Sequence, residues 1–362
     1  MKSESNSLRV VEASGPPSQL GFEIGTQCKD LGQQMVEDYR QELKQRHNLE
    51  WDRAKVISQK YLAFCQDSIP AIVEELQGYA RGAELSLDDV FTTVFWDYSE
   101  EKGEISGCTD FVVSANLTQE KHVLMAHNED FDPRYANYLC LVKAKPQNAP
   151  AFLNITPGGI LIGVGLNSAG LGFSGNGLSP NDTRVGIPST MFYHAMCGAR
   201  TIVDALTYAN LPHRGASDNY VVADNNGQIY DIEGSATDFE LIYAIDGYLV
   251  HTNHYVTQKM RRYESDFRDD IKSIRGHMCS VSRYNRALSL LRESEEISLQ
   301  RMMEILRDHA NYPCSICRHM DEKVKVDDRV KTIYSSVVDV TAQEMWVCCG
   351  NPCLGEYHRY TL

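Results

Sequence analysis

The order in which helical and strand-like patterns follow one another places the strongest limit on how this chain can fold. Up to about residue 95, apolar residues recur at helical spacing, as Ile72, Leu76 and Tyr79 do within 69–83. From Gly103 onward, short apolar runs typical of strands take over. Because a doubly wound parallel sheet needs strands and helices to alternate, this order favours mixed or antiparallel sheets sandwiched between helices.

The patterns predict individual elements. Helices are expected over 21–48, 54–64, 69–83, 188–206, 282–292 and 299–309, and one that Ser86 caps and that runs through Phe95. Thr201 is expected to be a second cap. Strands are expected over 111–114, 123–126, 139–142, 153–155, 160–166, 220–223, 228–232, 239–244, 248–251, 332–338, 344–348 and 357–360. No repeat or long linker interrupts the chain, so we expect residues 1–362 to form a single catalytic domain.

Charge and composition exclude several classes of partner. The chain carries 35 Lys and Arg against 49 Asp and Glu, a formal charge of −14. An acidic chain gains no attraction to phosphates, so we expect neither nucleic acid nor an anionic membrane as a partner. No apolar run reaches transmembrane length and no secretory signal is visible, so a cytoplasmic location is expected. In that reducing compartment the 11 cysteines are expected to be free thiols.

Gly107 and Cys108 stand where the helical region gives way to the first strand. On local spacing alone, a cysteine at the start of a strand is a buried core residue. The functional alternative is specific: glycine leaves its carbonyl unshielded, so the Cys108 thiol could attack it and shift the acyl group from nitrogen to sulfur. Water would then release a new N-terminal Cys108.

Three other segments suggest metal or ligand chemistry. Residues 127–132 hold one histidine and three carboxylates, which indicate either a metal site or a strand end turning into solvent. His251 and His254 could act as ligands, whereas Asn253 between them could donate to an oxyanion. The glycine-rich segment 158–172 lacks the dinucleotide-binding spacing and is typical of close backbone approach.

The C-terminal cysteines match a zinc motif poorly. Cys314 and Cys317 form one C-x-x-C pair, but Cys348, Cys349 and Cys353 do not form a second. We therefore expect no metal.

Taken together, eight segments in order resemble the acyl-coenzyme A:isopenicillin N acyltransferase family and its N-acyl amine hydrolase relatives, which are cysteine-type N-terminal nucleophile hydrolases. The segments are 21–25, 78–84, 107–109, 128–131, 165–170, 186–189, 251–254 and 311–318. The resemblance implies an α+β fold, a four-layer αββα sandwich of N-terminal nucleophile hydrolase type. It also implies self-cleavage between Gly107 and Cys108, which would leave chains 1–107 and 108–362 as a heterodimer.

The resemblance also implies roles for single residues. Cys108 is the implied nucleophile, Asp130 its supporting aspartate, Asn253 an oxyanion-hole donor and Gly177 the approximate backbone donor. The family's Ser-Arg pair falls on Asp328 and Arg329, with Asp in place of Ser. The expected substrate-binding set is Arg329, Asp328, Thr109 and Ser235.

The implied chemistry follows from the pKa of an α-amine. After cleavage, Cys108 would carry a free α-amine with an ordinary pKa of about 7.7–8.0, suited to a general base near neutral pH. The expected substrate is a small N-acyl amine or amino acid. If water takes the acyl group from Cys108, the enzyme is an amidohydrolase; if a second amine takes it, the enzyme is an acyltransferase. No cofactor is expected. Acyl-coenzyme A is a potential co-substrate. The alternatives are an inactive binding or scaffold relative, and a metal-dependent hydrolase using the Asp130 cluster with His251 and His254.

Overall fold

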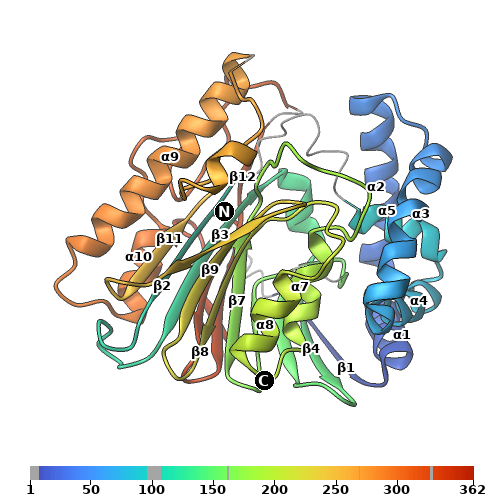
Figure 1. The fold of residues 1–362 in the computed structure, drawn as a ribbon, viewed down its shortest axis with the longest axis horizontal. Helices are drawn as coiled ribbons and strands as arrows, with labels where there is room; N and C mark the ends of the chain where they lie inside the picture. The colour runs from blue at the N-terminus through green and yellow to red at the C-terminus, as the bar shows by residue number, and fades with distance from the viewer. Residues whose placement is uncertain (1–7, 96–106, 161–162, 269, 327–328) are drawn as a thin grey trace.

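Two stacked β-sheets with helices on both outer faces form the protein (Figure 1). The computed structural model describes residues 8–95, 107–160, 163–268, 270–326 and 329–362. One sheet has the strand order β1-β4-β5-β6-β7-β8-β9-β10, and the other has the order β11-β2-β3-β12-β13-β14. Helices α1, α4, α7 and α8 lie against the first sheet, and α9 and α10 cover the second. The predicted four-layer αββα sandwich is confirmed.

The sheets are antiparallel apart from one pair. Strand β1 runs parallel to β4 at the edge of the larger sheet. The strands are β1 (Arg9–Gly15), β2 (Gly107–Val113), β3 (Leu124–Phe131), β4 (Leu139–Pro146), β5 (Phe152–Pro157), β6 (Gly165–Asn167), β7 (Leu171–Asn176), β8 (Asn219–Asp224), β9 (Ile229–Gly234), β10 (Phe239–Tyr243), β11 (Tyr248–His251), β12 (Lys331–Asp339), β13 (Glu344–Cys349) and β14 (His358–Thr361).

The helices follow the sequence pattern with three changes, the first of which is that the helix predicted over 282–292 begins at Ile271. They are α1 (Pro17–Gln27), α2 (Lys29–His47), α3 (Trp51–Ser68), α4 (Pro70–Ala83), α5 (Leu87–Val94), α7 (Thr190–Cys197), α8 (Ile202–Ala209), α9 (Ile271–Arg292) and α10 (Leu299–Leu306), with short 3₁₀ turns at Pro133–Asn137 and Met260–Tyr263. Cys28 interrupts the single helix predicted over 21–48, and the patch at 188–206 is two helices. The caps at Ser86 and Thr201 are confirmed: each side chain accepts a hydrogen bond from the backbone three residues on.

The prediction that the chain begins with helices alone is wrong, because β1 precedes them. Only Val11 and Ala13 of its seven residues are well buried, so its alternation is short and easily missed. Since β1 pairs with β4 over seven residues, the segment before Gly107 contributes a strand to the same sheet as the segment after it.

The prediction that all cysteines are free is also wrong. Cys279 of α9 and Cys314 of the loop between α10 and β12 form a disulfide. This bond attaches the long helix α9 to a loop that reaches the candidate active site.

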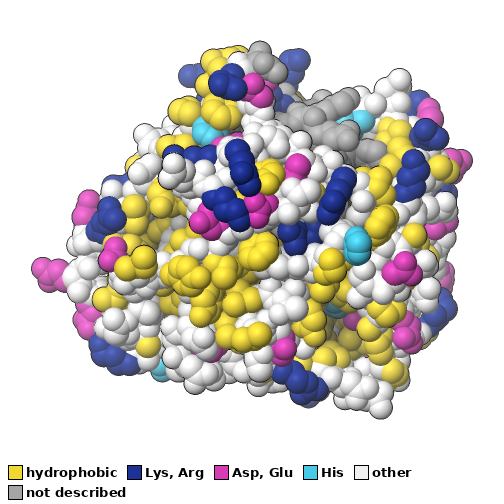
Figure 2. All heavy atoms as spheres, viewed as in Figure 1, with side chains coloured by type: hydrophobic (Ala, Val, Ile, Leu, Met, Phe, Trp, Pro, Cys, Tyr) yellow, Lys and Arg dark blue, Asp and Glu magenta, His cyan; other side chains and the backbone are white. Residues whose placement is uncertain are grey.

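No helix in the described part of the chain is both long and apolar enough to cross a bilayer. On the face shown in Figure 2, acidic and basic side chains are interspersed, with apolar side chains between them.

Helices α1 and α4 touch along two glycine pairs. Gly21 and Gly25 on α1 lie against the backbone of α4, where an added Cβ would stand 1.9 Å from Glu75 O and 2.2 Å from Tyr79 O. Gly78 and Gly82 on α4 meet α1 in the same way. The four-residue spacing puts both glycines of each helix on one face, so the two backbones approach closely.

We predict that Gly78→Ala destabilises the protein despite the better helix propensity of alanine. Its Cβ would stand 2.2 Å from Ser18 O, and overpacking of this kind costs about 1–3 kcal/mol. Chemical denaturation measures the free energy of unfolding. Gly198→Ala is the control, because its Cβ would meet its nearest atom at an ordinary 3.5 Å. Equal stability of both variants would contradict the close-packed interface.

Candidate active site

Strands β2 and β3 lie side by side and carry two of the four predicted catalytic residues, Cys108 and Asp130. Their antiparallel register sets Gly107 opposite Asp130 and Cys108 opposite Glu129. Side chains alternate between the two faces of a sheet, so Cys108 and Glu129 share one face while Gly107 and Asp130 share the other. The face of Cys108 and Glu129 points to the eight-stranded sheet, and the face of Gly107 and Asp130 points to α9.

The Cys108 thiol lies on the face between the two sheets. It is 4% exposed, and its Sγ donates a hydrogen bond to Glu129 Oε1 at 3.2 Å. Burial, reinforced by the nearby carboxylates Glu129, Asp130 and Asp110, raises the pKa of this thiol well above its usual value. In the continuous chain, the thiol therefore keeps its proton unless a neighbouring base accepts it.

His127 fixes the position of Glu129. Its ring lies between Asp110 Oδ1 at 3.1 Å and Glu129 Oε2 at 3.2 Å. Burial lowers the pKa of His127, but the two carboxylates outweigh it and raise that pKa to about 10. His127 is therefore a cation at neutral pH, and both its nitrogens donate.

Asn253 faces the backbone nitrogen of Cys108. It follows β11, whose antiparallel register with β2 sets His251 opposite Asp110 and so carries Asn253 to the level of Cys108. Its Oδ1 accepts from the Cys108 N–H at 2.8 Å, and its Nδ2 donates to Gly177 O at 3.1 Å. Ser280 of α9 accepts a hydrogen bond from the Asn253 backbone N–H at 2.8 Å.

The other face of β2 holds a buried charge cluster. A Cβ on Gly107 would lie 2.7 Å from Arg318 Nη1 and 3.2 Å from both Arg283 Nη2 and Asp130 Oδ2. Asp130 Oδ1 accepts from Thr332 Oγ1 at 2.7 Å, but Asp130 Oδ2 and Arg318 Nη1 are buried without a hydrogen-bond partner among the described residues. Any side chain at position 107 would therefore have to displace the Arg318 guanidinium.

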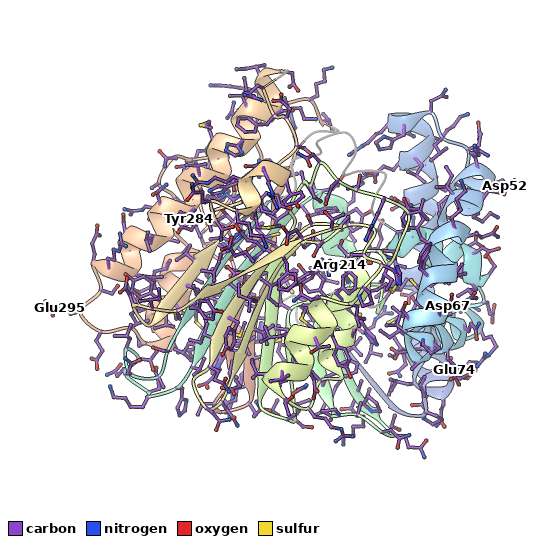
Figure 3. All side chains as sticks on the ribbon, viewed as in Figure 1. Asp52, Asp67, Glu74, Arg214, Tyr284 and Glu295 are labelled. Carbon is purple, nitrogen blue, oxygen red and sulfur yellow. A yellow bond between two sulfur atoms is a disulfide. The ribbon has the colours of Figure 1, made fainter. Side chains whose placement is uncertain are left out.

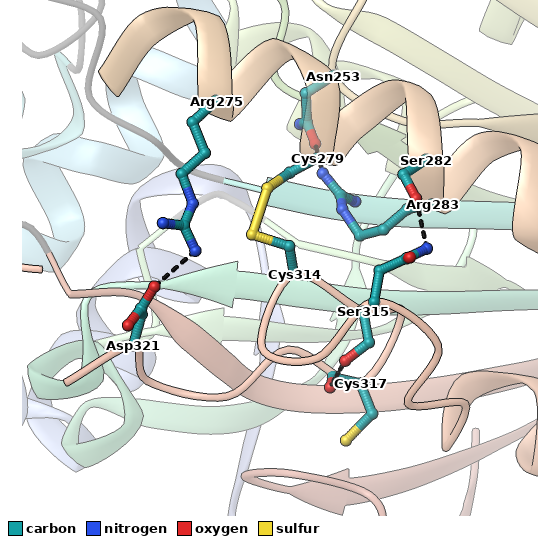
Figure 4. Close-up of a disulfide and its surroundings, with 10 residues drawn as sticks. Asn253, Arg275, Cys279, Ser282, Arg283, Cys314, Ser315, Cys317 and Asp321 are labelled. Atoms are coloured by element: carbon teal, nitrogen blue, oxygen red, sulfur yellow. Dashed lines mark hydrogen bonds and ion pairs between the residues drawn. A yellow bond between two sulfur atoms is a disulfide. The ribbon is translucent and has the colours of Figure 1, made fainter. Parts of the chain in front are cut away.

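Arg283 is the largest fully buried side chain near the site (Figure 4). It donates to the Cys108 carbonyl, to Thr109 Oγ1 at 2.8 Å and to Asn253 Oδ1 at 2.8 Å. Burial raises the pKa of Asp130 to about 6, although the positive charges of Arg283 and Arg318 act to lower it.

A pocket opens beside the Cys108 thiol, with a volume of about 160 Å³. Its walls are mainly apolar and aromatic; they include Phe131, Tyr135, Leu139, Ile155, Tyr193, Ile333 and Tyr334. Glu129 and Asp218 are the carboxylates in the lining. Burial raises the pKa of Asp218 to about 7.

The remaining predicted residues have different surroundings. Gly177 lines the pocket, and Thr109 contacts Arg283 on the opposite face of β2. Ser235 bonds to Asp182, and its carbonyl accepts from Arg214, labelled in Figure 3. Arg329 donates to the carbonyls of Val324 and Glu322. Neither Ser235 nor Arg329 lines the pocket, and Asp328 lies outside the described residues.

A metal fits this site poorly. Cys108, His127 and Glu129 offer ligand atoms within 4.8 Å of one another, but both ring nitrogens of His127 already face carboxylate oxygens, Asp110 Oδ1 and Glu129 Oε2. His251 is paired with Glu233 at 2.9 Å, and His254 lies 2.8 Å from Ser280 Oγ. Among the described residues, His251, His254 and Asp130 do not form a ligand cluster.

Three charged residues of the site were not assigned a role from sequence. Because side chains alternate along β3, pairing Cys108 with Glu129 would have assigned Glu129 and Asp130 to opposite faces of the sheet. Arg283 and Arg318 lie in α9 and in the loop after α10, and no local pattern indicates that they meet at Gly107.

Comparison with known proteins gives relatives over most of the chain. The chain is 23% identical to the acyl-coenzyme A:6-aminopenicillanic-acid-acyltransferase 40 kDa form of Emericella nidulans, over 94% of this chain and 92% of that protein. It is 25% identical to the beta-alanyl-dopamine/carcinine hydrolase of Drosophila melanogaster, over 84% of this chain and 83% of that protein. A conjugated bile acid hydrolase structure from Clostridium perfringens is 12% identical, covers 70% of this chain and 97% of its own, and has a TM-score of 0.47.

The profile of one protein family matches residues 117–353, a range that begins after Cys108 and contains Glu129, Asp130 and Asn253. This match covers more than half of the sequence. The chain therefore belongs to the acyl-coenzyme A:6-aminopenicillanic acid acyl-transferase family.

Proposed function

We propose that this protein is a self-processing cysteine enzyme that cleaves or transfers the acyl group of a small N-acyl amide. The observation that carries the proposal is the placement of Cys108: its thiol faces an apolar pocket and a carboxylate, while its own nitrogen is held by Asn253. One residue thus presents a nucleophile and a future amine at the same site. The family membership and the relatives' names, an acyltransferase and an amide hydrolase, support the reaction class.

Processing would begin with transfer of the Cys108 thiol proton to Glu129. The sulfur then attacks the Gly107 carbonyl carbon, the bond from that carbon to the Cys108 nitrogen breaks, and the nitrogen takes up a proton. Water hydrolyses the resulting thioester and leaves Gly107 as a carboxylate. Arg283 and Arg318 outnumber Asp130 beside Gly107, so the local charge favours the developing oxyanion.

Processing would also create partners for atoms that lack them. Asp130 Oδ2 has no hydrogen-bond partner among the described residues, and it lies 3.2 Å from where a Cβ on Gly107 would stand, next to the residue whose amine would be freed. Asn253 Oδ1 already accepts from that nitrogen. The two fragments would stay together because β1 pairs with β4 and because the helices before Gly107 cover the larger sheet.

The pocket supports an apolar acyl group. A cavity of about 160 Å³ is comparable with the roughly 150 Å³ that holds one benzene ring. The aromatic walls would bury the acyl group while its carbonyl carbon meets the Cys108 sulfur. An alternative is a short acyl group that carries an amine, which Glu129 and Asp218 would favour and which the β-alanyl substrates named for the Drosophila relative contain.

We predict that Cys108→Ala remains a single chain and has no amidase activity. Intact-mass measurement of the wild-type protein should instead show fragments 1–107 and 108–362. Cys349→Ala, which changes a half-buried free cysteine outside the pocket, should process normally. Wild-type protein that stays intact while releasing amine from amides would overturn the processing step, and intact, inactive wild-type protein would favour the scaffold alternative.

A substrate panel tests the acyl pocket. We predict that phenylacetyl and hexanoyl amides of one amine are cleaved at least ~10-fold faster in kcat/KM than the β-alanyl amide, because burying the apolar group contributes about 1–3 kcal/mol. Amine release is measured with and without a second acceptor amine, which separates hydrolysis from transfer. A preference for the β-alanyl amide would contradict the apolar acyl group.

Processing should slow in acid. The pKa of Asp130 is about 6, so below that pH its carboxylate becomes neutral and can no longer stabilise the freed amine. We predict that the cleavage rate of freshly translated chain falls about tenfold per pH unit below this value, as for a single essential group. Asp130→Asn should be slow at every pH.

Asp218→Asn is the control for this titration. Asp218 also has a raised pKa, but it lies in the pocket. The Asp218→Asn variant should therefore still show the decrease of the cleavage rate in acid. A wild-type cleavage rate that stays level for one pH unit on either side of 6 would contradict the role of Asp130.

A further inference from the structure

We propose that His309, Cys317, His319 and Cys353 form a structural zinc site. Three of these residues belong to the loop between α10 and β12, and Cys353 follows β13. Their four ligand atoms all lie within 4.8 Å of one another. The site is separate from the Cys108 pocket, and none of its residues has a part in the proposed reaction.

The distances fit a tetrahedron around one ion. At zinc bond lengths of about 2.3 Å to sulfur and about 2.05 Å to nitrogen, tetrahedral edges are about 3.8 Å between sulfurs, 3.3 Å between nitrogens and 3.5 Å between sulfur and nitrogen. The two sulfurs are 3.6 Å apart and the two Nε2 atoms 3.1 Å apart. His319 Nε2 is 3.6 Å from Cys317 Sγ and 3.4 Å from Cys353 Sγ.

The surroundings match those of a metal-bound thiolate. The Asn351 side-chain amide donates to Cys317 Sγ at 3.6 Å, and the neighbouring backbone of Cys353 also hydrogen-bonds to Cys317. Hydrogen-bond donors next to a metal ligand orient that ligand and stabilise its charge. Two thiolates and two imidazoles in a tetrahedral arrangement are typical of zinc. Because the protein supplies all four ligands, the ion has no open position and its role is structural.

The site would hold Arg318 in place. Arg318 lies between the ligands Cys317 and His319, and its carbonyl accepts from Asn351 at 2.7 Å. Its backbone N–H donates to Thr332 Oγ1, the same hydroxyl that donates to Asp130. The disulfide fixes the same loop from the other side through Cys314 (Figure 4). Zinc and the disulfide would together define where the Arg318 guanidinium meets Gly107.

Metal analysis of the full-length Cys108→Ala protein tests this proposal independently of processing and activity. We predict about one zinc ion per chain by elemental analysis, as four-ligand sites of this type bind a single ion. Cys353→Ser and the exposed His309→Ala should each lose most of that zinc, whereas Cys349→Ser on the same hairpin should keep it. Cobalt substituted for zinc should show the visible absorption of a tetrahedral thiolate complex, and Cys353→Ser should abolish it.

Two results would overturn the proposal. One is a well-folded protein, by circular dichroism, that contains no stoichiometric zinc and takes up no cobalt after reduction. The other is peptide mapping that finds Cys317 and Cys353 joined as a disulfide in freshly purified protein. His309→Ala guards against misfolding as the cause of zinc loss, because its side chain is exposed.

Discussion

The burial of Arg283 is the interaction on which the active site depends. Its side chain is 2% exposed, and an uncompensated guanidinium in that position would cost several kcal/mol. Compensation comes from the Cys108 carbonyl, Thr109 and Asn253, and from the charge of Asp130. These partners belong to β2, to the loop after β11 and to β3, so one side chain from α9 brings three segments into a fixed arrangement around the proposed nucleophile.

Strand β2 separates two regions of opposite charge. On the pocket side, Glu129 and Asp110 outnumber the protonated His127. Burial, reinforced by these carboxylates, raises the pKa of the Cys108 thiol, and Glu129 is a proton acceptor next to it. On the helix side, Arg283 and Arg318 outnumber Asp130 around Gly107. In the proposed processing step, a proton would move toward the negative side while the oxyanion would develop next to the positive side.

A feature of the fold or of the candidate site could be predicted from the sequence only where residues close together in the chain indicate it. The succession of patterns predicted antiparallel or mixed sheets between helices, and the resemblance implied the four layers; Gly107-Cys108 stood out because glycine before cysteine has a specific chemical use. The position of Asn253 next to Cys108 follows only from the register between β2 and β11. The positions of Arg283 and Arg318 next to Gly107 follow only from the tertiary fold. The His309, Cys317, His319 and Cys353 cluster was missed because Cys314 suggested the wrong pair: it bonds to Cys279, and the fourth ligand comes from a distant hairpin.

The loop that carries Arg318 therefore holds both the disulfide and the proposed zinc ligands. Arg318 Nη1 is buried with no hydrogen-bond partner among the described residues, so no side-chain hydrogen bond of that atom fixes its position. Its backbone is fixed instead, by Thr332 and Asn351 and by neighbours on both sides that are cross-linked or proposed metal ligands. A guanidinium held through its backbone leaves its donors available for a charge that appears only during reaction. Preorganised donors of this kind stabilise an oxyanion without reorganising at the moment it forms.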